Sequence, residues 1–373
     1  MSDVPLGVYL SGGIDSSSVV AMIKNLGMNN IKTFSVGFND GVNELPYAKK
    51  VAEFFSTEHK EFIVDHNIVN NLPKIVWHSD EPLCDPAMMP VFLLSKNAKK
   101  YVTVVLTGDG ADETLAGYEQ VKFLSFANKL CKIPFSKPLI KSSLNLIPNS
   151  FANKIFKYSS ALGDEGKKRA VNFISDINDI PKAYNDIVSI FDNKEQFNLT
   201  GRTSNSENYV KDYFLGKNVI NRVLNFETKV LLPENMLAKS DRMAMAFSIE
   251  SRVPFLDKRL VDFAFSIPIK LKLNGFNDKY LLRKSMGTLL PKSITSRGKQ
   301  RFYVPIDVWL KNDLSSMVNE KLSKNNIDKH GLFNSYYIEK IKNNFDNSPL
   351  FYARQLWSLL TFQIWYEEFI EKS

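Results

Sequence analysis

A run of glycine, serine and aspartate at residues 11–17 (SGGIDSS), between an apolar segment and a helical pattern, has the composition of a phosphate-binding loop. Its two glycines can let the backbone adopt positive φ and approach a ligand closely. The hydroxyls of Ser11 and Ser16, with the free N–H groups at a helix start, form a cradle for an anion. Asp15 beside that cradle is compatible with phosphate only if a cation such as Mg²⁺ lies between them. The alternative is a plain tight turn in which Asp15 and Ser16 only cap the helix.

A second loop of similar composition, TGDGADE at 107–113, follows the β-branched run VTVVL at 102–106. Such a run is typical of a buried parallel strand. The carboxyl ends of parallel strands meet at one edge of a sheet, where ligands bind. We therefore expect Asp112 to reach the same cation as Asp15, which would give a two-carboxylate Mg²⁺ site across neighbouring loops.

Strand and helix patterns alternate through the first 120 residues, with apolar strands predicted at 6–10, 31–38, 59–64 and 102–106. This alternation predicts an α/β fold with a doubly wound parallel sheet. The alternation then stops, which predicts a helical insertion followed by a mostly helical remainder. We thus expect a single domain with three regions at 1–120, 121–225 and 226–373.

SGGIDSS differs from two common phosphate motifs. No lysine follows the glycines as the Walker A pattern GxxxxGK[ST] requires, and the loop lacks the Rossmann pattern GxGxxG. Kinase, GTPase and dehydrogenase functions therefore lose their main support. The loop instead resembles the pyrophosphate-binding loop of the N-type ATP pyrophosphatases. That resemblance implies an adenine nucleotide alpha hydrolase-like fold and cleavage of ATP between its α and β phosphates.

Further segments are similar to the asparagine synthetase family, in the order that the family has them. The resemblance covers about residues 3 to 310 and is loose across the insertion. Several ordered motifs are more specific than any one of them. They are DEPLCDP at 80–86, TGDGADE followed by Gly117-Tyr118, KSDRMAMA at 239–246, IESRVPFLD at 249–257, KYLLRK at 279–284 and RGKQRF at 297–302.

The resemblance implies the synthetase half of a glutamine-hydrolysing asparagine synthetase. Such an enzyme activates the side-chain carboxylate of aspartate as β-aspartyl-AMP and releases pyrophosphate. Ammonia then displaces AMP and forms asparagine. The resemblance also implies ATP and Mg²⁺ as cofactors, with Asp15 and Asp112 on the metal. The nucleotide would be bound by Leu10, Ser11, Gly12, Gly13, Asp15, Ser16, Val36, Thr107 and Gly108.

Three residues are implied as catalytic. Lys299 would meet the charge that develops as pyrophosphate leaves, which stabilises the transition state more than bound ATP. Asp109 and Glu250 would lie near the acyl-adenylate, where a carboxylate can accept a proton from attacking ammonia. The alternatives are a surface lysine at 299 and a structural hydrogen bond or ion pair at 109 and 250.

The sequence departs from the family at three places. Complete members begin with a glutaminase domain whose nucleophile is a cysteine directly after the initiator Met, whereas Ser2 follows Met1 here. We therefore expect no glutamine hydrolysis by this chain alone, and either free ammonia or a partner glutaminase as the nitrogen source. Asp109 stands where the best-known members carry Glu, and LPEN at 232–235 replaces a frequent LPDD. These differences leave open a sugar-carboxylate amidotransferase or a cyclising β-lactam-type synthetase.

Composition bears on the remaining classes of function. The net charge of +8 comes from dispersed lysines and no Cys-x-x-Cys pair is present, so neither a tRNA-modifying enzyme nor a nucleic-acid partner is predicted. No apolar run approaches the ~20 residues of a membrane span. Two cysteines fit a reducing cytoplasm. The His, Asp, Glu and Cys residues at 78–85 do not have the spacing of a common zinc site. Two alternatives stay open: a remnant without catalytic activity in place of an active enzyme, and a homodimer in place of a monomer.

Overall fold

The computed structural model describes residues 3–38, 43–133, 137–138, 159–203, 206–300 and 303–372. Its contacts divide the chain into two units. The α/β unit comprises Met1–Tyr118 and Glu227–Pro305, and the helical unit comprises Glu119–Phe226 and Ile306–Ser373. Each unit is thus built from two separate stretches of sequence.

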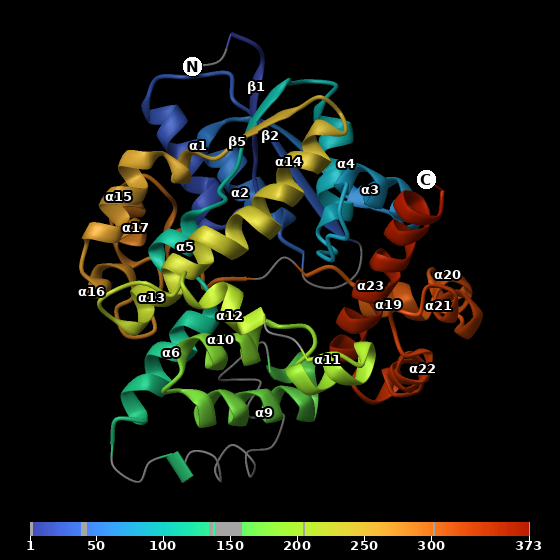
Figure 1. The fold of residues 1–373 in the computed structure, drawn as a ribbon. Coiled ribbons are helices and arrows are strands. Elements are labelled where there is room, and N and C mark those ends of the chain that lie inside the picture. The colour runs from blue at the N-terminus through green and yellow to red at the C-terminus, as the bar shows by residue number, and fades with distance from the viewer. Residues whose placement is uncertain are drawn as a thin grey trace. The chain divides into compact units, whose positions relative to one another are not determined.

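A five-stranded sheet with the order β3-β2-β1-β4-β5 forms the centre of the α/β unit, and all neighbouring strands are parallel (Figure 1). The chain runs from β1 outward through β2 to β3, then crosses to the other side of β1 for β4 and β5. The topological switch point therefore lies between β1 and β4, where α/β sheets bind their ligands. The strands are β1 (Leu6–Tyr9), β2 (Lys32–Phe38), β3 (Glu58–Val64), β4 (Val104–Leu106) and β5 (Glu250–Arg252).

The predicted doubly wound parallel sheet is confirmed, and the four predicted strands correspond to β1 through β4. Strand β5 is an addition that the sequence pattern did not reveal. It has only three residues, exposed or half-buried, so it carries no apolar alternation to detect. Its pairing of Ser251 with Val105 extends the sheet beyond β4.

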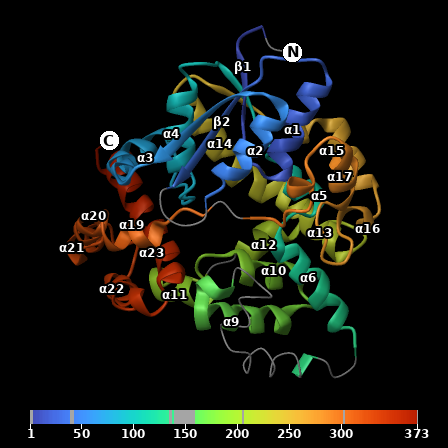
Figure 2. The same cartoon turned by 180° about the vertical axis from the view of Figure 1, so that it is seen from behind.

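Helices cover both faces of the sheet (Figures 1 and 2). Consecutive residues of β1 divide between the two faces, because Val8 joins one apolar core and Tyr9 borders the other. The Val8 core is covered by α1 (Ile14–Asn25), α2 (Leu45–Phe55), α15 (Lys258–Ser266) and α17 (Tyr280–Ser285). The opposite core is covered by α4 (Met88–Ala98) and α14 (Ala238–Met245).

The α/β unit also contains several shorter elements. Its remaining α-helices are α3 (Leu72–Ser79), α5 (Ala111–Leu115), α16 (Ile269–Lys272) and α18 (Lys292–Thr295). Short 3₁₀ turns occupy η1 (His66–Asn71), η3 (Pro254–Leu256) and η4 (Met286–Thr288), and η2 (Glu227–Leu237) is a π-helix that includes Pro233.

The predicted third region, 226–373, is shared between the two units. Its first part, up to Pro305, completes the α/β unit because β5 pairs with β4 and α14, α15 and α17 pack on the sheet. Its second part joins the predicted insertion in the helical unit. The sequence pattern could not separate these parts, since both are mostly helical.

The helical unit is built around α23 (Pro349–Tyr366), in which Leu356, Trp357 and Leu360 are buried. Its other described helices are α6 (Glu119–Leu130), α9 (Ser159–Asp176), α10 (Ile180–Val188), α11 (Asn193–Thr200), α12 (Ser206–Lys211), α13 (Val219–Phe226), α19 (Ile306–Lys311), α20 (Ser315–Lys321), α21 (Lys324–His330) and α22 (Ser335–Asn343), with the 3₁₀ turn η5 (Phe345–Asn347) and the π-helix η6 (Glu367–Glu371). Within the described ranges, no helix of the chain combines the length and the apolarity needed to cross a bilayer.

Candidate active site

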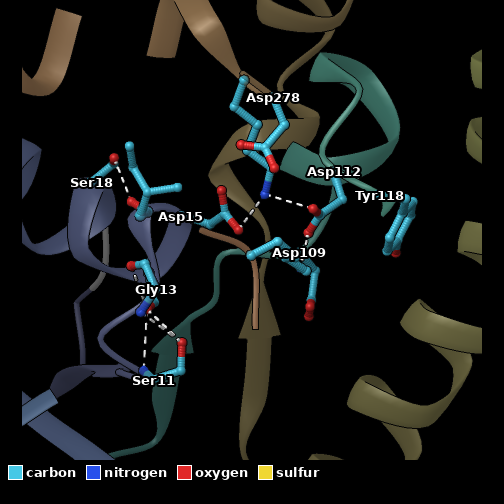
Figure 3. A network of polar contacts seen from close by, with 12 residues as sticks. Ser11, Gly13, Asp15, Ser18, Asp109, Asp112, Tyr118 and Asp278 are labelled. Carbon is cyan, nitrogen blue, oxygen red and sulfur yellow. Dashed lines mark hydrogen bonds and ion pairs between the residues drawn. The ribbon is translucent and has the colours of Figure 1, made fainter. Parts of the chain in front are cut away.

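The loop after β1 joins the strand to α1 through two serine side chains. The Ser11 and Ser16 hydroxyls lie 3.1 Å apart, and the Ser11 N–H also donates to Ser16 Oγ at 3.1 Å. The Gly13 N–H donates to Ser11 Oγ at 3.2 Å (Figure 3). No side chain caps the start of α1 at Gly13, so this helix end keeps donors that can face an anion. The two hydroxyls and the start of α1 thus lie side by side, as a cradle for an anion requires.

The glycines of this loop play different parts. Gly12 has φ +70°, and a Cβ there would lie 2.4 Å from the Ala48 backbone nitrogen of α2. Gly13 has φ −72°, an ordinary value for any residue. The expectation of positive φ therefore holds for Gly12 alone, and the close approach that Gly12 permits is to α2.

The loop after β4 lies directly against the first turn of α1. A Cβ on Gly108 would be 2.8 Å from the Ser16 backbone nitrogen and 2.9 Å from Asp15 Cβ. Only a residue without a side chain allows this approach. The parallel pairing of β1 with β4 sets the two loops side by side, as expected for the switch point of the sheet.

Four charged side chains meet between these loops, and we call them the aspartate–lysine cluster: Asp15, Asp112, Lys279 and Lys299. Lys279 Nζ lies 2.6 Å from Asp15 Oδ2 and 2.7 Å from Asp112 Oδ1, and Figure 3 shows both carboxylates turned toward this nitrogen. Lys299 Nζ lies 2.6 Å from Asp112 Oδ2. The Lys279 side chain is only 1% exposed, so its charge is neutralised by these carboxylates rather than by water.

The two carboxylates differ in their electrostatic environment. Burial would raise the pKa of Asp112, but the ammonium groups of Lys279 and Lys299 outweigh it and hold that pKa well below its usual range. Burial raises the pKa of Asp15, and Lys279 opposes this only in part. Burial lowers the pKa of Lys299, yet the two aspartates overcompensate and keep it above its usual value. Lys299 is therefore a fixed cation at neutral pH.

Two buried acceptors of the cluster lack a hydrogen-bond partner among the described atoms, Asp15 Oδ1 and Asp112 Oδ1, and only Asp112 Oδ1 has an ion pair with Lys279. Over the same part of the chain, three or more His, Cys, Asp or Glu residues nowhere gather as a metal cage would require. A pair of aspartates with a free oxygen suits Mg²⁺, which takes one or two carboxylates and completes its shell with phosphate oxygens and water. The residues present therefore fit this ion when phosphate is bound beside it.

Asp109, in the same loop as Asp112, is held by two hydroxyl groups. Thr107 Oγ1 donates to Asp109 Oδ2 at 2.9 Å, and Ser240 Oγ of α14 donates to the same oxygen at 3.1 Å. Both bonds go to Oδ2, so they orient the carboxylate without using its Oδ1. Asp109 is half-buried, so it is open to a small reactant.

The loop at 79–87 is fastened to α14 by two ion pairs. Lys239 Nζ lies 2.7 Å from Asp85 Oδ2, and Arg242 Nη1 lies 2.5 Å from Glu81 Oε1 while also donating to the Ser79 carbonyl. Glu81 and Asp85 of the DEPLCDP segment are therefore structural partners of the KSDR segment.

Comparison with known proteins agrees with this geometry. The family model described as Asparagine synthase matches residues 1–367. The chain is 34% identical over 383 residues to "Asparagine synthetase [glutamine-hydrolyzing] 1" of Bacillus subtilis, with 100% of this chain and 57% of the relative covered. The chain belongs to the asparagine synthase family.

Two further relatives are similar to most or all of the chain at lower identity. "Putative asparagine synthetase [glutamine-hydrolyzing]" of Mycobacterium tuberculosis is 28% identical over 380 residues, covering 100% of this chain and 56% of the relative. "Amidase chyE" of Penicillium rubens is 25% identical over 380 residues, covering 88% of this chain and 54% of the relative. The chain spans about half the length of the curated relatives that it matches.

Most of the residues singled out in the sequence gather at the carboxyl edge of the sheet. Leu10 is buried directly after β1, its N–H bonded to the Phe34 carbonyl at 2.8 Å. Val36 lies half-buried in β2. Thr107 follows β4, where its N–H donates to the Arg252 carbonyl at 3.0 Å. Leu10 and Thr107 thus begin the loops that lead to Asp15 and Asp112, and Val36 lies in the neighbouring strand β2.

Glu250 is the exception, and its predicted catalytic role is withdrawn. It is the first residue of β5, its N–H donates to the Thr103 carbonyl before β4, and it is exposed to solvent. Its carboxylate pairs with Arg252, Nε to Oε1 at 2.6 Å. A residue at the amino end of a parallel strand lies at the edge opposite the ligand site. The alternative expectation for Glu250, a structural ion pair, agrees with its pairing with Arg252.

Sequence reasoning missed two cations of the site. Lys279 belongs to the KYLLRK segment, for which the sequence indicated no separate role, although it is the most buried member of the cluster. Arg297, in RGKQRF, donates to the Gly12 carbonyl at 3.2 Å and to Glu44 Oε1 at 3.0 Å, and its guanidinium lies 3.8 Å from the centroid of the Tyr47 ring. Membership of a family motif was the only signal available for either residue.

Proposed function

We propose that this chain is an ATP-dependent carbon–nitrogen ligase that activates the side-chain carboxylate of aspartate as β-aspartyl-AMP and converts it with ammonia into asparagine and AMP. The observation that carries the proposal is the pair Asp15 and Asp112, joined by Lys279 at the switch point of the sheet. Membership of the asparagine synthase family supports the reaction class.

In the first step, a carboxylate oxygen of the substrate attacks the α-phosphorus of ATP, and the bond from that phosphorus to the bridging oxygen of pyrophosphate breaks. The Ser11 and Ser16 hydroxyls and the start of α1 would bind phosphate oxygens. Asp15 and Asp112 would hold Mg²⁺, which neutralises charge on the phosphates when bound. Lys299 and Lys279 would meet the negative charge that grows on departing pyrophosphate.

In the second step, the ammonia nitrogen attacks the acyl carbon, the bond from carbon to the AMP oxygen breaks, and AMP leaves. The new C–N group must lose a proton. Asp109 is the candidate acceptor, because its carboxylate is oriented by Thr107 and Ser240. Binding both reactants side by side supplies proximity, which can account for a large part of the rate.

A second candidate function is amide formation on another carboxylate, such as a sugar acid or the precursor of a β-lactam ring. It is favoured by Asn235, which lies half-buried in η2 four residues before Lys239, at a position where the family frequently has an acidic residue. An amide there offers no negative charge to the ammonium group of an amino-acid substrate. One relative of the chain is named an amidase, so the name asparagine synthetase does not extend to every similar protein.

The test is to incubate the chain with ATP, Mg²⁺, ammonium and one acid at a time, and to quantify AMP and pyrophosphate. The proposal expects release that depends on aspartate. Release with a different acid selects the second candidate, and no acid-dependent AMP with any acid contradicts both. Glutamine is tested in place of ammonium, alone and with an added glutaminase, to identify the nitrogen source.

Asp15→Asn provides the matched site variant, because it keeps the shape of the side chain and removes its charge. Pyrophosphate release should be abolished, whereas Asp262→Asn, at an exposed aspartate paired with Lys258, should leave it unchanged. An undiminished rate in Asp15→Asn would show that the metal assignment is mistaken.

A further inference from the structure

Arg283 of α17 uses nearly all of its hydrogen-bonding capacity inside the α/β unit. Its Nε donates to both the carbonyl and Oδ1 of Asp278 at 2.9 Å, and its Nη2 donates to Asp278 Oδ1 at 2.5 Å. Its Nη1 donates to the carbonyls of Thr295 at 2.9 Å and Arg297 at 2.8 Å. The Arg283 side chain is 16% exposed and that of Asp278 is 3% exposed, so the arrangement is largely sheltered from water.

These partners flank the two lysines of the aspartate–lysine cluster. Asp278 directly precedes Lys279, and Arg297 lies two residues before Lys299. One planar guanidinium therefore ties the backbone that presents the first lysine to the backbone that presents the second. The hydrogen bonds of Arg283 go to Asp278, Thr295 and Arg297 and not to Asp15 or Asp112, so its influence on the cluster passes through that backbone.

The segment that carries Lys299 depends on such side-chain support. Helix α18 ends at Thr295, and residues 297–300 belong to no helix or strand. No ladder of backbone hydrogen bonds fixes this segment, yet Lys299 Nζ lies 2.6 Å from Asp112. The two carbonyl contacts from Arg283 fix the start of the segment, and the contact of Arg297 with Gly12 fixes its side chain.

Only arginine has the geometry for this role. Its donors lie in one rigid plane and can serve a carboxylate on one side and two carbonyls on the other. The lysine ammonium is a compact group on a flexible stem and cannot span both sides at once. Arg283→Lys therefore keeps the positive charge beside the buried Asp278 while breaking the link to Thr295 and Arg297.

We propose that Arg283 is a positioning residue that places Lys299 for pyrophosphate departure without touching the substrates, an inference that rests on the proposed function. Arg283→Lys should lower kcat for pyrophosphate release by about 10- to 100-fold, the scale expected when a catalytic group is displaced by about 1 Å. The KM for aspartate should stay within about two-fold, since Lys299 acts mainly on the transition state.

The decisive experiment is a double-mutant cycle with Lys299→Ala. If Arg283 acts through Lys299, Arg283→Lys should cost less than about three-fold in the Lys299→Ala background, because the group that it positions is already gone. Where the steady-state rate of Lys299→Ala falls below detection, the same cycle is measured as single-turnover release of labelled pyrophosphate with the protein in excess over ATP. A penalty that is undiminished in the Lys299→Ala background, by either readout, overturns the proposal.

Arg259→Lys is the matched control, because Arg259 also pairs with an aspartate, Asp257, but is 92% exposed. It should leave both kcat and the cycle unchanged. Melting temperatures of all variants are measured as well. If Arg283→Lys only damaged the fold, it would lower the melting temperature and the activity by the same amount in the wild-type and in the Lys299→Ala background. An active wild type with an unaffected Arg283→Lys variant contradicts the positioning role alone, whereas an inactive wild type contradicts the proposed function.

Discussion

Lys279 Nζ lies 2.6 Å from Asp15 Oδ2, although 264 residues separate the two along the chain. The same nitrogen lies 2.7 Å from Asp112, so one buried cation holds together the loops that follow β1 and β4. Lys279 has φ +46°, a left-handed conformation that a non-glycine residue adopts only when its surroundings require it. The chain thus accepts local strain where it places this ammonium group.

Replacing Lys279 with Met should destabilise the chain strongly. Two carboxylates would remain buried with only Lys299 to compensate them, and breaking a buried pair in this way costs about 3–5 kcal/mol. Urea unfolding at pH 8 measures the loss. Lys258→Met, at a side chain that is 89% exposed, is the control and should change stability by less than about 0.5 kcal/mol. Equal effects of the two variants would refute the buried cluster.

The raised pKa of the Glu113 carboxyl group should make the stability of the fold depend on pH. Burial, with the neighbouring charge of Asp112, raises the pKa of Glu113 to about 7. Because this exceeds the unfolded value of about 4.3, the folded state binds more protons between these pH values, and the free energy of unfolding should fall as pH rises from 4.3 to 7. Glu113→Gln keeps an acceptor for the Tyr118 hydroxyl, 2.5 Å from Glu113 Oε1, and should remove this contribution.

The expected gain for Glu113→Gln is up to about 4 kcal/mol at pH 8 and near zero at pH 4. Denaturant unfolding from pH 4 to 8 measures both values, with Glu320→Gln, at a side chain that is 68% exposed, as the control. A gain of the same size at both ends of the range would contradict the raised pKa.

Gly117 has no side chain, and this gives Asp112 and Lys279 of the cluster the room that they need. A Cβ at this position would lie 2.0 Å from Asp112 Oδ1 and 2.1 Å from Lys279 Cε. Gly117→Ala should therefore displace both side chains, lower the free energy of unfolding by about 1–3 kcal/mol and abolish pyrophosphate release. Gly287→Ala, where nothing lies within 4 Å of the added Cβ, should leave both measurements unchanged. Wild-type activity in Gly117→Ala would argue against the packing described here.

Asp109 and Glu250 give opposite expectations. Asp109→Asn removes the candidate proton acceptor and should lower the rate of amide formation by about 10²–10⁴-fold. Glu250→Gln only breaks an exposed pair with Arg252 and should keep the rate within about two-fold. Product analysis with ammonium as nitrogen source measures both. A large loss in Glu250→Gln would restore the role that the structure removes.

The sequence predicted those parts of the site that follow from strand order. Asp15 and Asp112 come directly after apolar strands, and parallel strands present their carboxyl ends at one edge, so their proximity could be expected. Lys279 could not be placed in this way, because it belongs to a short helical segment whose position depends on packing over the sheet. Glu250 lies in β5, whose three residues show no strand pattern, so the sequence could not tell which end of a strand it occupies.

The most direct test of the account follows an oxygen atom. Aspartate labelled with ¹⁸O in its side-chain carboxylate is incubated with the chain, ATP, Mg²⁺ and ammonium, and AMP is analysed by mass spectrometry. Attack of the carboxylate on the α-phosphorus predicts one ¹⁸O in each AMP formed, with asparagine in equal amount. AMP without label, or ADP in place of AMP, would contradict activation through β-aspartyl-AMP.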